Sequence, residues 1–157
     1  MADAVLSAAR SRRHAVARSR RRREDVWIGS TALAAALAAL PLAPSSWHGP
    51  EVASVLAVSA TALLAGQRWA IALVVMAQLL VAPTLAERAF FGSLDLWPGR
   101  IAALTALILI VPGLLAMRRA AAALVLVTGA RRTRDTCRRF HLVLVATGAI
   151  AAVVPLI

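Results

Sequence analysis

The sequence predicts an all-α fold, a polytopic transmembrane bundle of about five helices whose N-terminus lies in the cytoplasm. Two observations lead to this expectation. Hydrophobic residues make up 61% of the 157 residues, whereas soluble globular proteins contain roughly 45–50%. Charged residues make up only 16%, and they gather in clusters between long uncharged stretches. The surface of a water-soluble domain needs charges spread along the chain, so this pattern favours a membrane protein.

Five hydrophobic stretches are expected to form the membrane helices. They cover residues 26–43, 52–67, 69–86, 101–117 and 140–157. A helix needs about 20 apolar residues to cross a bilayer, within a range of roughly 17 to 25. Four stretches meet this requirement directly. The second crosses only if Glu51, Gly66 and Gln67 lie at the level of the lipid headgroups.

Helices of a soluble bundle would keep a polar face, and these stretches lack one. Residues 69–86 contain only Gln78 and Thr84 as polar side chains, and residues 101–117 contain only Thr105. Strict alternation of polar and apolar residues is absent, which favours helices over strands. A kink is expected at Pro112, because proline removes a backbone donor and crowds the preceding turn.

Arginine clusters set the expected orientation. Residues 1–25 form a basic tail with eight of the 18 arginines, and residues 118–139 form a basic loop with seven. Cytoplasmic segments close to membrane helices are enriched in arginine. A cytoplasmic N-terminus places all but two of the arginines inside, and it places all four tryptophans at the membrane interfaces. Within the loop, residues 120–130 are too short to cross. They are expected to extend the fourth helix or to lie in the interface.

The basic N-terminal segment has two other interpretations. An export signal is disfavoured because no A-x-A cleavage pattern follows the first apolar stretch, so the first helix is expected to be retained. Nucleic-acid binding is raised by the net charge of +11. It is disfavoured because residues 10–23 contain no aromatic side chain for stacking on bases. Anionic lipid headgroups are the expected partners of the arginines. The residues assigned to topology and lipid contact are Arg20, Arg21, Arg22, Arg23, Arg118, Arg119, Arg131 and Arg132.

No pattern of residues indicates catalysis or metal binding. The sequence contains no G-x-S-x-G, no H-E-x-x-H, no paired carboxylates and no glycine-rich phosphate loop. His14, His48 and His141 fall at different depths in the expected topology, so two of them are not expected to hold a haem together. The single cysteine, Cys137, cannot form a disulfide within the chain. We therefore expect no enzymatic activity, no cofactor and no metal.

A small set of polar and helix-breaking residues remains as candidate contacts. Gln78 is the one strongly polar side chain at mid-depth, and it is expected to form an interhelical hydrogen bond or, alternatively, to contact a solute. The loop of residues 87–100 mixes acids, arginines and aromatics. The candidate contacts with a partner or solute are Gln78, Glu87, Arg88, Asp95, Arg100, Pro112 and Gly113.

Small residues recur at the spacing that allows membrane helices to approach closely. The second stretch carries them every four residues, and the last stretch repeats this spacing. The residues assigned to helix packing are Ala53, Ala57, Thr61, Ala65, Gly148 and Ala152. Their partner is either internal or another subunit.

Residues 87–116 loosely resemble the closing helices of the large fused permeases of tripartite periplasmic-type transporters. In both, a loop with glycine and leucine leads through an arginine into an apolar span that ends in Pro-Gly. The resemblance covers about a fifth of the chain. It implies a component of a small-solute transporter or channel as the alternative function. The expected function is an accessory, assembly or structural subunit of a larger complex in a bacterial inner membrane, packed against other membrane subunits.

Overall fold

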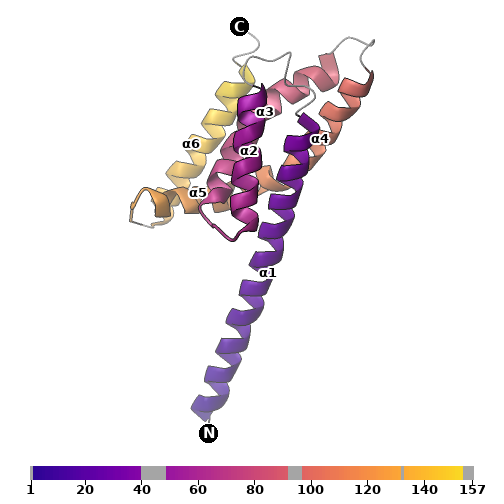
Figure 1. The fold of residues 1–157 in the computed structure, drawn as a ribbon. Coiled ribbons are helices and arrows are strands. Elements are labelled where there is room, and N and C mark those ends of the chain that lie inside the picture. Colours follow the sequence, from indigo (N-terminus) through magenta and orange to yellow (C-terminus); the bar gives the residue numbers. More distant parts are fainter. Residues whose placement is uncertain (1, 40–48, 92–96, 132, 154–157) are drawn as a thin grey trace.

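The computed structural model describes residues 2–39, 49–91, 97–131 and 133–153. Within these ranges the chain forms six helices and no strand, so the all-α class is confirmed (Figure 1). In chain order the helices are α1 (Ala2–Ala39), α2 (Gly49–Leu64), α3 (Ala70–Phe91), α4 (Trp97–Leu115), α5 (Met117–Val127) and α6 (Arg134–Val153).

The first helix, α1, runs without a break from the basic tail into the first apolar stretch. At 1.5 Å per residue its 38 residues span about 57 Å. Figure 1 shows its N-terminal half extending beyond the other helices. Arginine and alanine favour helix, and an ion pair of 3.3 Å between Arg20 Nε and Glu24 Oε1 adds support one turn apart. At the border between the basic tail and the apolar stretch, the side chains change from charged to apolar while the backbone remains helical.

The boundaries of the next helices differ from those expected. Helix α2 ends at Leu64 and not at residue 67, because Gly66 adopts a φ of +97° and turns the chain toward α3. Helix α3 continues to Phe91 and not to residue 86, with Pro83 inside it. Helix α4 begins at Trp97, before the expected residue 101, and contains Pro112. The expected ends of the first and last stretches, residues 40–43 and 154–157, lie outside the described residues.

The segment of residues 118–139, expected to connect two membrane helices on the cytoplasmic side, is mostly helical. It contains nearly all of α5 and the first turns of α6. Helix α5 is a separate helix and not an extension of α4, because Ala116 between them has a ψ of 9° instead of a helical value. Figure 1 shows α5 lying across one end of the bundle. Its alanine-rich sequence explains why a helix forms there.

The core is built mainly from small side chains. Alanine is the commonest buried residue, with Ala32, Ala35, Ala36, Ala53, Ala60, Ala70, Ala77, Ala103, Ala106, Ala120 and Ala121 each at most 3% exposed. Larger side chains such as Leu56, Leu63 and Ile110 are buried among them, but many other large apolar side chains lie on the outside. Along α4 the exposed ones are Ile101, Leu104, Ile108, Val111 and Leu115, and on α6 they are Leu142, Val143, Val145 and Ile150. The helices thus approach closely through alanines and also present many large apolar residues outward.

Two of the described helices are long and apolar enough to cross a membrane, over residues 70–91 and 98–115. The sequence predicted five such helices, and the structure does not support that number. Helix α2 is shorter than a full crossing, with an apolar part of residues 51–64. The apolar part of α1 is described only to Ala39. Helix α6 begins with a charged segment, residues 134–139.

Candidate functional site at the arginine-rich end

Arg119 joins the short helix α5 to the middle of α1. Its Nη1 lies 3.2 Å from Glu24 Oε2, and its Nη2 contacts Asp25 Oδ1. Glu24 also pairs with Arg20 on its own helix. The Asp25 side chain is only 14% exposed, so this ion pair is partly shielded from water. Arg119, assigned to lipid contact from the sequence, is engaged within the protein.

Arg22 binds the C-terminal end of α2. Its Nη2 donates a hydrogen bond of 3.0 Å to the carbonyl oxygen of Leu64, the last residue of that helix. Carbonyls at a helix C-terminus lack intrahelical partners and carry partial negative charge, so a guanidinium suits this position. A β-carbon at Gly66 would lie 3.0 Å from Arg22 Nη1. Glycine therefore serves both the turn and the approach of Arg22.

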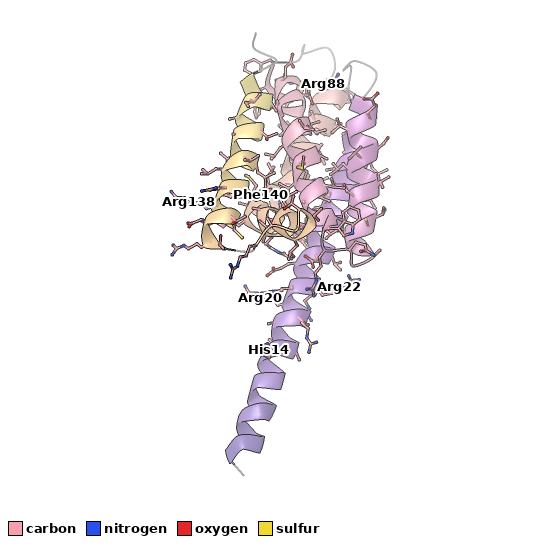
Figure 2. All side chains as sticks on the ribbon, turned by 90° about the vertical axis from the view of Figure 1, so that its left-hand side faces the viewer. His14, Arg20, Arg22, Arg88, Arg138 and Phe140 are labelled. Carbon is pink, nitrogen blue, oxygen red and sulfur yellow. The ribbon has the colours of Figure 1, made fainter. Side chains whose placement is uncertain are left out.

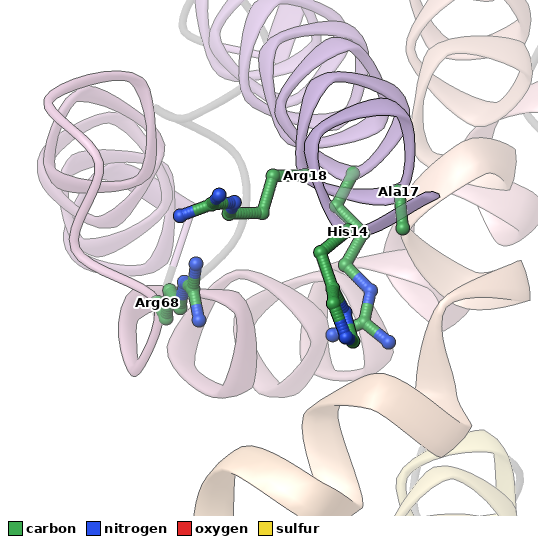
Figure 3. Close-up of a pocket in the computed structure, with 5 residues that line it drawn as sticks. His14, Ala17, Arg18 and Arg68 are labelled. Carbon is green, nitrogen blue, oxygen red and sulfur yellow. The ribbon is translucent and has the colours of Figure 1, made fainter. Parts of the chain in front are cut away.

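A surface cavity of about 600 Å³ lies between α1 and the turn that joins α2 to α3 (Figure 3). It is lined by His14, Ala17, Arg18, Arg21 and Arg68. Arg21 and Arg68 also line a neighbouring cavity of about 320 Å³, together with Glu24, Asp25 and Arg119. Of the residues that line the larger cavity, only Arg21 was a candidate from the sequence, as a residue for topology and lipid contact; His14, Arg18 and Arg68 were not. The spacing of His14, Arg18 and Arg21 places all three on one face of α1, which the sequence alone indicates. Arg68 lies in the turn between α2 and α3, and only the fold brings it to this face of α1.

At the other end of the bundle, Glu87, Arg88 and Arg100 line neither of these two cavities. Figure 2 shows Arg88 at the end opposite to Arg20 and Arg22. Arg100 Nε donates a hydrogen bond of 3.3 Å to the carbonyl oxygen of Ala89, near the C-terminus of α3. Glu87 is exposed, and Asp95 lies outside the described residues. Arg100 thus links α4 to α3 instead of facing a solute path.

Gln78 and Gly113 lie against each other in the middle of the bundle. Gln78 is completely buried on α3, and a β-carbon added to Gly113 of α4 would lie 2.6 Å from its Cδ. Both amide atoms of Gln78 lack a hydrogen-bond partner among the described residues, so the expected interhelical hydrogen bond is not made there. Pro112 borders a cavity of about 360 Å³ with Trp27 and Arg119. Gln78 lines neither this cavity nor the two above.

The residues assigned to helix packing lie in different surroundings. Ala53 is buried and Ala57 is half-buried, whereas Thr61 and Ala65 are exposed. The face of α2 that enters the core consists of Ala53, Leu56, Ser59, Ala60 and Leu63. Gly148 of α6 packs against Leu79, because a β-carbon there would lie 2.9 Å from Leu79 Cδ2. The side chain of Ala152 lies outside the described residues.

The remaining assigned arginines and the possible metal ligands are dispersed. Arg23, Arg118 and Arg131 are exposed, and Arg132 lies outside the described residues. Cys137 is half-buried, and His141 Nδ1 is buried without a hydrogen-bond partner in the described part of the chain. Among the residues that the structure describes, no group of three or more His, Cys, Asp or Glu side chains is placed to hold a metal ion.

Comparison with protein families, with curated proteins and with solved structures found no match to this chain.

Proposed function

We propose that this protein is an integral protein of a bacterial inner membrane that acts as an accessory, assembly or structural subunit of a larger membrane complex. The observation that carries this proposal is the large number of exposed leucine, isoleucine and valine side chains that surround an alanine-rich core. In water, exposed leucines and isoleucines cost roughly 25 cal/mol per Å² of apolar surface. In lipid they cost nothing comparable, and small residues at the contacts let the helices pack closely.

Helix α4 supports membrane embedding more strongly than α3. Only 22% of its 18-residue apolar window is buried within the protein, compared with 56% for α3. The core helix of a soluble protein is mostly buried. An apolar helix that leaves most of its length uncovered is suited to contact with lipid or with another membrane helix.

The proposed topology has five crossings, formed by the apolar half of α1 and by α2, α3, α4 and α6. Helices α2 and α6 are shorter in apolar length than a full span, so their polar ends would lie at headgroup level. The N-terminus lies in the cytoplasm, because arginines concentrate at that end and attract the anionic inner leaflet. Helix α5 lies in the cytoplasmic interface, where Arg119 joins it to α1.

The accessory role is favoured over transport by the surroundings of Gln78. A solute path through the bundle would need a polar cavity at this residue, the one strongly polar side chain at mid-depth. Gln78 is instead packed against Gly113 and lines none of the three cavities. The outward-facing apolar residues of α4 offer a surface for a neighbouring subunit.

Membrane placement is tested by fractionating cells that express the untagged chain. The protein should remain in the membrane pellet after alkaline carbonate washing, because its apolar surface is held by lipid tails. Reporter fusions at the N-terminus should report a cytoplasmic location. Recovery of the folded protein in the soluble fraction would overturn the proposal.

The subunit role is tested by purifying the protein from native membranes in mild detergent. Other membrane proteins should co-purify in fixed proportion, and their yield should fall when Ile108 or Val111 on the exposed face of α4 is changed to a charged residue. A monodisperse monomer that moves a solute into vesicles would favour the transport function instead.

A further inference from the structure

Six of the arginines at the arginine-rich end of the bundle divide into two groups of three. Arg20, Arg22 and Arg119 have partners within the protein, namely carboxylates or the end of a helix. Arg18, Arg21 and Arg68 form no ion pair among the described residues, and all three border the 600 Å³ cavity. Glu24 and Asp25 line the neighbouring cavity, and no carboxylate of the described residues lines the 600 Å³ one. Its positive charge is therefore not compensated by its own walls.

The geometry of the cavity suits an anion with several oxygens. Figure 3 shows Arg18 on α1 and Arg68 on the α2–α3 turn directed toward one another, with His14 on the same face of α1. Two guanidinium groups repel each other unless an anion lies between them. Guanidinium groups donate paired hydrogen bonds to phosphate oxygens, and His14 provides a further donor.

The depth of the cavity indicates where that anion comes from. Arg68 is followed by Trp69, which is 46% exposed, and then by the apolar helix α3. On α1, the exposed Trp27 lies six residues beyond Arg21, at the start of the apolar half of the helix. Tryptophans prefer the membrane–water interface, the level at which lipid phosphates lie. Among the described residues, no Phe, Tyr or Trp lines the cavity, and these are the side chains that offer the largest stacking surface to a nucleic acid.

We infer that this cavity, formed by His14, Arg18, Arg21 and Arg68, binds the phosphate of an anionic phospholipid headgroup. The inference rests on the proposed membrane location. It goes beyond a general attraction of arginines to lipid, because it assigns one defined site and excludes Arg22 and Arg119 from it. The bound headgroup would bridge the basic half of α1 to the α2–α3 turn.

The test compares lipids retained by the full-length protein. Wild type and variants are reconstituted in vesicles of equimolar phosphatidylcholine and phosphatidylglycerol and extracted in mild detergent. The ratio of the two lipids bound to the protein is then measured by native mass spectrometry. The double variant R18Q/R68Q removes the facing guanidiniums. The control R138Q/R139Q removes two exposed arginines of α6 that do not line the cavity. Far-UV circular dichroism checks that helix content is unchanged.

The preference for phosphatidylglycerol should fall about tenfold in R18Q/R68Q and less than about twofold in the control. The variant R18K/R68K keeps the charge but loses the paired hydrogen bonds. Its preference for phosphatidylglycerol should lie between those of wild type and R18Q/R68Q. Equal losses in R18Q/R68Q and R138Q/R139Q would overturn the site, because they would indicate diffuse charge only.

A second arm separates lipid from free phosphate. Inorganic phosphate, added to the extracted wild type at the concentration of phosphatidylglycerol, should leave the bound lipid in place. Complete displacement would overturn the lipid assignment in favour of a soluble phosphate compound. Failure of the membrane location itself would appear separately, in the carbonate wash, and so the two proposals can fail independently.

Discussion

The arginine-rich end and the middle of the bundle hold their helices together by different physics. At the arginine-rich end, Arg119 meets two carboxylates, in a place where water still reaches the partners. In the middle, Gln78 is fully buried against Gly113, and its amide has no described partner. The first contact depends on charge and the second on shape. Arg119 and Gln78 are both polar candidates in the sequence, but Arg119 holds its helices together by charge and Gln78 by shape.

The largest effect is expected from filling the space at Gly113. The substitution Gly113→Ala places a β-carbon 2.7 Å from Gln78 Nε2, so the fully buried amide of Gln78 must move within a packed interior. We expect a loss of about 2–3 kcal/mol in the free energy of unfolding, measured by denaturant titration in mild detergent. The double variant G113A/Q78A should recover most of this loss, because the smaller side chain vacates the space. Additive losses would contradict a direct contact.

A smaller loss is expected from breaking the charge contact. The substitution Arg119→Gln leaves the partly buried carboxylate of Asp25 without its partner. The cost should be about 1–2 kcal/mol, between the values for exposed and for buried pairs, and it should shrink at high salt. Arg118→Gln, which changes an exposed neighbour, serves as the control. An equal loss in both variants would show that the contact to α1 contributes little.

Removing the buried amide should stabilise the protein. Gln78→Met keeps the length of the side chain but lacks the two polar atoms that have no described partner. We expect a gain of about 1 kcal/mol in the free energy of unfolding, because a desolvated, unpaired amide is unfavourable. A loss of stability instead would reveal that the amide has a partner in the membrane.

The smallest effect is expected at the C-terminus of α2. Arg22→Gln removes the guanidinium that donates to the carbonyl of Leu64, and the cost should be about 0.5 kcal/mol. Arg23→Gln is the matched control, since it removes the same charge from an exposed position. Hydrogen exchange of the last turn of α2 should increase in the first variant only. Equal exchange in both would exclude the capping role.

The helical class and the places of the apolar helices followed from the sequence, because long uncharged stretches without polar faces leave little alternative to helices. The side-by-side placement of His14, Arg18 and Arg21 was also accessible, from helical spacing alone. Helix ends were less predictable. The stop of α2 depends on the φ of Gly66, and the separation of α5 from α4 depends on the backbone at Ala116.

Sequence by itself determined which segments are apolar and which segments carry most of the positive charge, since both depend only on the side chains within each segment. Only the tertiary structure decided which arginines are neutralised within the protein and which line a cavity, because Arg68, Arg119 and the carboxylates meet across helices far apart in the chain. It also decided that Gln78 faces Gly113, a contact set by how α3 and α4 pack against each other. Pairwise contacts of this kind depend on helix packing, which no single stretch of sequence encodes.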